Sequence, residues 1–116
     1  MKNKNKSTVH QLQQGDVLLL SIPALPTACK PTKKDARGIV LAEGEATGHY
    51  HGIDNERGVA LMEGPAGERF LVNDTGDAIT IKHQEHKPVS VPPGIWQIGQ
   101  VREKDWFADM VRPVID

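Results

Sequence analysis

The stretch VALMEGPAGERFLVNDTGDAITIKH, residues 59–83, decides the fold class. Its apolar runs are short, and the turn-forming segments GPAG at 64–67 and NDTGD at 73–77 separate them. Glycine supplies the positive φ that tight turns need, and proline cannot extend a β ladder, so both segments predict hairpin connections. Short apolar runs bounded in this way predict strands rather than helices.

The same pattern continues outward in both directions from this stretch. The predicted strands cover residues 16–22, 38–43, 49–53, 59–63, 68–72, 78–83, 88–91 and 95–102. Eight short strands are typical of a small β-barrel or β-sandwich, so we expect an all-β single domain over residues 15–116. Only the C-terminus departs from this strand pattern. There an N-cap at Asp105 and the i,i+4 pair Trp106 and Met110 predict a short C-terminal helix.

Composition narrows the class of protein. The chain has 116 residues, 14 Lys and Arg against 15 Asp and Glu, and Cys29 as its one cysteine. A balanced charge argues against a nucleic-acid partner, and a lone cysteine excludes an internal disulfide, so we expect a cytoplasmic protein. No apolar run approaches the length needed to span a bilayer, so we expect no membrane segment. Residues 1–14 lack periodicity and are predicted to be a flexible N-terminal arm.

Four of the five histidines fall into two short clusters: His49, His51, His83 and His86. Successive side chains of a strand point to opposite faces, so His49 and His51 share a face with the apolar Ile53. By the same rule, His83 shares a face with Ile81. A buried neutral imidazole needs a partner, and imidazole nitrogen is a good ligand for zinc, iron or nickel. The four histidines therefore predict a divalent-metal site, with Glu85 as an alternative ligand to His86.

Two interpretations of the function stay open on these residues. In the first, the metal site binds or acts on an unknown small molecule, with no catalytic residue assigned beyond the metal ligands. In the second, the histidines are structural, and the chain is a non-catalytic interaction or accessory module, for example of a phage or other mobile element. Unpaired strand edges would also permit a homodimer.

The segment from Gly44 through the His49-x-His51 pair to Gly64 resembles the first motif of the cupin superfamily. The resemblance implies a cupin-like barrel, in which His49, His51 and Glu56 would be metal ligands. The second cupin motif resembles the stretch from Pro92 to Gln97, but it places Gln97 where the family has its last histidine ligand. Either Gln97 completes the site, or His83 and His86 replace the missing ligand.

The chain also resembles a group of small uncharacterised bacterial and phage-associated proteins. Their shared features correspond here to Gln14-Gly15-Asp16 and to residues 44–51, 83–88 and 92–103. This resemblance spans nearly the whole predicted domain. It implies no activity, but its segments include the same four clustered histidines.

Overall fold

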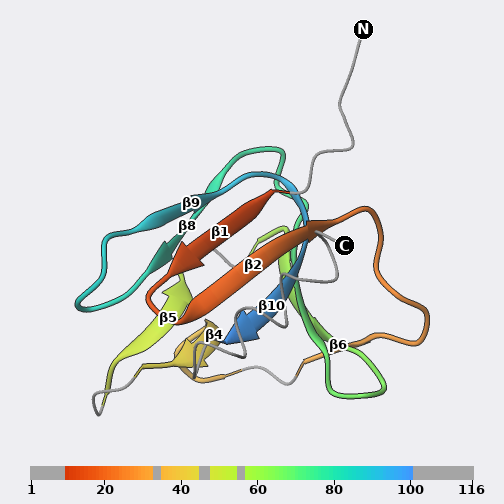
Figure 1. Cartoon of the computed structure of the whole chain (residues 1–116), viewed down its shortest axis with the longest axis horizontal. Helices are drawn as coiled ribbons and strands as arrows, with labels where there is room; N and C mark the ends of the chain where they lie inside the picture. Colours follow the sequence, from red (N-terminus) through yellow and green to blue (C-terminus); the bar gives the residue numbers. More distant parts are fainter. Residues whose placement is uncertain (1–9, 33–34, 45–47, 55–56, 101–116) are drawn as a thin grey trace, which may run out of the picture.

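The computed structural model describes residues 10–32, 35–44, 48–54 and 57–100, and these form two antiparallel β-sheets (Figure 1). The larger sheet has the strand order β1 (Gln11–Gln14), β2 (Val17–Ile22), β10 (Gly94–Gln100), β7 (Arg69–Asn73), β6 (Val59–Glu63) and β3 (Lys30–Pro31). The smaller sheet has the order β4 (Ile39–Glu43), β5 (Tyr50–Ile53), β8 (Ile79–Lys82) and β9 (Val89–Val91). The prediction of an all-β protein is confirmed.

Each of the eight predicted runs overlaps one of these strands, with ends that differ by at most one residue where both are described. Two strands are additional. The short β3 lies in a segment that lacks any repeating apolar face. The strand β1 lies within the predicted arm, so that prediction is wrong for residues 11–14, while residues 1–9 lie outside the described part of the chain.

The hairpin of β1 and β2 explains why the polar segment QLQQ is ordered. Gln14 pairs with Val17 across a two-residue turn, and Gly15 has a φ of 57°, which glycine adopts without strain. The strand β2 is buried along most of its length, and its free edge accepts β1 through main-chain hydrogen bonds. Those bonds do not depend on apolar side chains, so the hydrophobic pattern does not reveal β1.

The core lies between the two sheets. Its buried side chains come from both: Leu19, Leu41, Ile53, Leu71, Ile79, Ile81, Val91 and Trp96. Along β8 the alternation is clear, because Ile79 and Ile81 are buried while Thr80 and Lys82 are exposed. His83 follows immediately, on the parity of the buried residues, and this places its side chain at the rim of the core.

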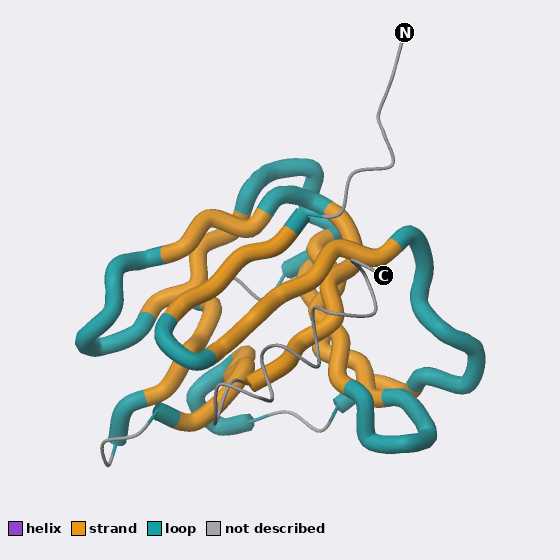
Figure 2. The backbone as a smooth tube through the Cα atoms, viewed as in Figure 1, coloured by secondary structure: helices purple, strands orange, loops and turns teal. Residues whose placement is uncertain are grey.

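The two sheets approach each other on both sides without closing into one barrel. On one side, β1 lies beside β9 (Figure 2). There the Gln14 side chain of β1 donates a hydrogen bond to the carbonyl of Lys87, just before β9. On the other side, β4 lies near β6 without ladder hydrogen bonds between them. The described strands thus form a two-sheet structure, not the closed cupin-like barrel favoured by the sequence.

Helical structure is absent from the described residues, so they include no helix that could cross a membrane. The helix predicted after Asp105 lies outside the described residues.

Candidate metal centre

His51 is the buried centre of the histidine cluster. It lies in β5, its exposed fraction is only 1%, and its Nδ1 is 2.8 Å from Oε1 of Gln14 in β1. Thirty-seven residues of sequence separate the two partners. The hairpin of β1 and β2 therefore supplies a polar contact to the histidine motif of the other sheet.

The hydrogen bonds of Gln14 determine which nitrogen of His51 carries the proton. The Gln14 amide nitrogen donates to the carbonyls of Ile81 and Lys87, each at 2.9 Å. This fixes the amide orientation, because the opposite orientation would place the Gln14 oxygen against two carbonyl oxygens. Oε1 of Gln14 can only accept, so His51 donates through Nδ1–H. The Nε2 atom of the neutral imidazole is left with a free lone pair.

That lone pair faces a carboxylate. Nε2 of His51 lies 3.5 Å from Oδ1 of Asp16, which occupies the turn between β1 and β2. The second carboxylate oxygen of Asp16 accepts a hydrogen bond of 2.9 Å from the Gln100 side chain, which orients the carboxylate. A neutral imidazole nitrogen and a carboxylate oxygen are both acceptors, so a proton on Nε2 or another cation between them would stabilise this contact.

His83 and His86 lie beside His51. The ring centroid of His83 is 4.4 Å from that of His51 and 4.5 Å from that of His86, and the centroids of His51 and His86 are 6.0 Å apart. When two imidazoles share an ion at bond lengths of about 2.1 Å, each centroid lies about 3.2 Å from it, so the two centroids can be at most about 6.4 Å apart. All three separations meet this limit.

Two glycines make room for these rings. A Cβ on Gly15 would lie 2.6 Å from Nε2 of His86, and a Cβ on Gly44 would lie 2.7 Å from Nε2 of His83. Both distances are shorter than side chains tolerate. The rings of His83 and His86 therefore pack against glycine main chain. A side chain at position 15 or 44 would displace them.

His49 lies at the edge of the cluster. Its ring centroid is 5.7 Å from that of His83, and its Nδ1 is buried without a hydrogen-bond partner. The nearest charged atom recorded for it is Oε2 of Glu85, at 3.6 Å. Among the clustered rings, His49 thus has its recorded ring contact with His83.

The cluster is not arranged as a formed metal shell. Among the described residues, no three His, Cys, Asp or Glu side chains converge on one point at coordination distance. His83 Nδ1 accepts a hydrogen bond of 3.0 Å from the main-chain N–H of Glu85. The proton of neutral His83 is therefore on Nε2, and binding through that nitrogen requires the proton to leave and the ring to turn. The His86 side chain is exposed.

The cluster favours neutral imidazoles. Burial lowers the pKa of His51 below its ordinary value of 6.5, and the neighbouring His83 lowers it further, while Asp16 opposes the shift. Burial also lowers the pKa of His83, with His86 and His49 adding to the effect. Neutral imidazoles are the form that binds metal ions.

These shifts predict a pH-dependent stability of the protein in EDTA. The unfolded chain takes up protons on His51 and His83 near pH 6.5, whereas the folded chain takes them up only at lower pH, so the free energy of unfolding should fall as the pH drops from about 7 to about 5. Urea unfolding at several pH values measures this slope. We expect His51→Ala to reduce the slope and His10→Ala to retain it, because His10 is exposed and outside the cluster. Equal slopes in both variants would contradict the expectation.

The structure brings the four predicted histidines together and adds Gln14 and Asp16 as their partners. The resemblance to the small bacterial and phage-associated proteins includes Gln14 and Asp16 but gives them no role. Gln97 lies outside the cluster: it belongs to β10 in the larger sheet, and its neighbours Trp96 and Ile98 are the residues that face the core. Glu56 lies outside the described residues.

Comparison with known proteins places the chain in a family. One family model, described as a domain of unknown function (DUF8820), matches residues 13–101, a span that includes Asp16 and all four clustered histidines. No curated protein and no solved structure matched the chain. The matched span is more than half of the chain, and the protein therefore belongs to the DUF8820 family of domains of unknown function.

Proposed function

We propose that this domain binds one divalent metal ion, zinc or else iron or nickel, at the turn between β1 and β2. The observation that carries the proposal is the pair of facing acceptors, Nε2 of His51 and Oδ1 of Asp16, 3.5 Å apart beside a fixed Nδ1–H. Their separation is close to that of two ligands on one tetrahedral ion with bonds of about 2.1 Å. The lowered pKa of His51 disfavours a proton as the cation.

His83 and His86 would complete the shell after a rotation of their rings. Three imidazoles and one carboxylate are a donor set that suits zinc, iron and nickel better than calcium or magnesium, which prefer oxygen ligands. Gln14 would act as the outer partner that orients a ligating histidine through its second nitrogen, as is usual at metal sites. The cupin-like interpretation of the first motif gives His51 the same role, although the proposal does not rest on it.

The surroundings of the site favour a small-molecule ligand on the metal. An open cavity of about 330 Å³ lies over the cluster, lined by Gln13, Gly15, Asp16, His51, His83, Glu85 and His86. A volume of this size admits a small molecule beside the ion. Bound there, a metal ion would polarise a carbonyl group or activate a water molecule. The Glu85 carboxylate, which is exposed at the rim of the cavity, would then be placed to accept a proton.

The test measures metal content and affinity. Protein purified without an affinity tag should contain about one equivalent of zinc, iron or nickel by mass spectrometry. After EDTA treatment and dialysis, it should bind Zn²⁺ with a stoichiometry near one in calorimetry. Asp16→Asn removes the charge with little change in size, and we expect about tenfold weaker binding of Zn²⁺, or about 1.4 kcal/mol. His10→Ala is the matched control, because it removes an exposed histidine and should leave the affinity unchanged.

Two results would overturn the proposal. One is a wild-type protein that takes up far less than one equivalent of every metal offered. The other is a loss of Zn²⁺ affinity that is the same in His10→Ala as in Asp16→Asn, since this would mean that the ion binds at scattered surface histidines.

A further inference from the structure

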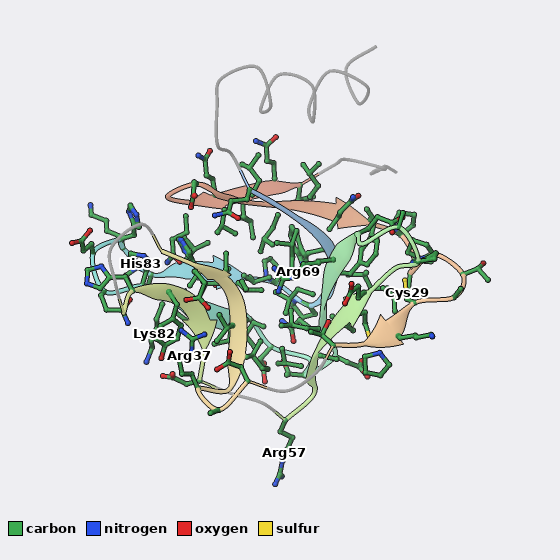
Figure 3. The ribbon with its side chains drawn as sticks, turned by 90° about the horizontal axis from the view of Figure 1, so that it is seen from below. Cys29, Arg37, Arg57, Arg69, Lys82 and His83 are labelled. Carbon is green, nitrogen blue, oxygen red and sulfur yellow. The ribbon has the colours of Figure 1, made fainter. Side chains whose placement is uncertain are left out.

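A second cavity, of about 510 Å³, lies between the sheets on the side where β4 approaches β6. Its lining residues are Thr32, Asp35, Gly38, Val40, Leu41, Ala42, Glu43, Gly44, Leu61, Arg69 and Gln100. None of them lines the cavity over the histidines. In Figure 3, His83 lies toward one end of the molecule and Arg69 nearer its middle.

Arg69 provides a fixed positive charge in this cavity. Its two terminal nitrogens donate to the main-chain carbonyls of Leu41 and Val40. The ladder between β4 and β5 is irregular from Val40 to Ala42, and Arg69 binds the carbonyls exposed there. A guanidinium has five N–H donors, and only these two hydrogen bonds of Arg69 go to acceptors in the described residues.

No carboxylate of the described residues forms an ion pair with Arg69. Asp35 and Glu43 lie on the same cavity, but both are held by Arg37, at 2.9 Å and 2.6 Å. Arg37 lowers the pKa of both carboxyl groups, so they stay ionised and paired with it. Within the described part of the chain, the charge of Arg69 is therefore balanced by main-chain dipoles alone. Its half-buried position strengthens its attraction for an anion, because the charge is partly desolvated.

A second polar group of the cavity lacks a partner. The hydroxyl oxygen of Thr32 is buried and makes no hydrogen bond, although its main-chain N–H donates to the carbonyl of Leu61 at 2.8 Å. An unsatisfied buried hydroxyl costs about 1–3 kcal/mol, so such groups are uncommon unless something else occupies the site. Thr32 thus brings an unpaired hydroxyl to the same cavity as Arg69, and the aliphatic side chains of Val40, Ala42 and Leu61 line the remainder.

We propose that this cavity binds a small monoanionic carboxylate, which accepts hydrogen bonds from the Arg69 guanidinium and from the Thr32 hydroxyl. The planar fork of arginine matches the two oxygens of a carboxylate. A dianionic phosphate would also match the fork, but it would meet stronger repulsion from the carboxylates of Asp35 and Glu43. The inference is independent of the proposed metal ion, because it uses none of the histidines.

Butyrate is the probe for this site, with butyramide as its neutral counterpart of the same shape. We expect butyrate to cause saturable shifts of the amide signals of β4 and β7 in ¹H–¹⁵N NMR spectra of the full chain, with a Kd on the order of 1 mM. Butyramide and phosphate should bind at least tenfold more weakly. Addition of EDTA should leave the butyrate Kd unchanged, which separates this site from the metal centre.

Substitutions assign the binding to named groups. Arg69→Gln should weaken butyrate binding at least tenfold. Thr32→Val, which keeps the shape of the side chain and the main-chain hydrogen bond, should weaken it about threefold and tests the site even if Arg69→Gln does not fold. The control Lys82→Gln removes a cation whose ion pair with Asp54 lies on another surface, and it should not change the Kd.

The inference fails if butyrate causes no saturable shifts up to high millimolar concentration, or if butyramide or phosphate binds as tightly as butyrate. It also fails if Thr32→Val and Lys82→Gln give the wild-type Kd alike, because the anion would then not be in this cavity. Loss of butyrate binding in EDTA would place the carboxylate on the metal ion instead, and this too would overturn the inference.

Discussion

Replacing His51 with alanine should lower the affinity of the domain for Zn²⁺ by at least about 100-fold. His51 is the one imidazole whose free lone pair is fixed in the structure, because Gln14 holds the proton on Nδ1 and Asp16 faces Nε2. The other three histidines have more freedom or a different protonation, so they cannot replace it. Competition with a chelating dye for Zn²⁺ measures the affinity of wild type and variant.

Loss of structure must be separated from loss of a ligand in this experiment. His51→Ala also leaves a gap in a buried position and removes the partner of Gln14, so the variant should unfold at a lower urea concentration than the wild type. Circular dichroism without urea should nevertheless show the β structure of the wild type. A folded His51→Ala protein with wild-type Zn²⁺ affinity would show that the ion binds elsewhere.

The histidine cluster was predictable from the sequence because it follows a local rule. Alternation in a strand places His51 and His83 on the same parity as Ile53 and Ile81, and these two apolar residues are buried in the structure. The antiparallel pairing of β5 with β8, in which Ile53 faces Ile81, then brings the two histidine motifs together. Local pattern predicted the faces of both strands, and the pairing of the strands placed the two motifs side by side.

The partners of the cluster were not predictable in this way. Gln14 and Asp16 contact His51 because the hairpin of β1 and β2 lies beside β9, and this arrangement of the two sheets leaves no trace in the polarity of the segment. A glutamine in a polar segment normally indicates solvent exposure, yet the exposed fraction of Gln14 is 3%. Three hydrogen bonds compensate for its burial, and two of them go to main-chain carbonyls, which no sequence pattern identifies.

Gln97 shows the limit of the cupin resemblance, which left open whether this residue or the pair His83 and His86 completes the site. The spacing after Pro93-Gly94 suggested a ligand position, but Trp96 occupies the core-facing position of β10 with an exposed fraction of 3%. Alternation then directs Gln97 to the other face of the larger sheet. The motif spacing resembles that of cupins, but Gln97 lies on the face of β10 that points away from the core.

Replacing Gln14 with leucine should have the largest effect on stability. Leucine has a similar size, but it cannot satisfy the carbonyls of Ile81 and Lys87 or the Nδ1–H of His51. Leaving these buried groups without partners should lower the free energy of unfolding by about 2–4 kcal/mol and the Tm by about 10–20 °C. Urea and thermal unfolding in EDTA measure both. The affinity of the folded variant for Zn²⁺ should also fall by about 10- to 100-fold, because His51 is no longer held with its proton on Nδ1.

A second substitution at the same position separates these two roles of Gln14. Glutamate keeps an oxygen that accepts from Nδ1–H of His51, but it cannot donate to the carbonyls of Ile81 and Lys87. Gln14→Glu should therefore destabilise the protein as much as Gln14→Leu, while the Zn²⁺ affinity of the folded protein stays within about threefold of wild type. If the two variants lost metal affinity equally, Gln14 would act only through the stability of the hairpin. If only Gln14→Leu lost it, the proton on Nδ1 of His51 would be what prepares Nε2 to bind the ion.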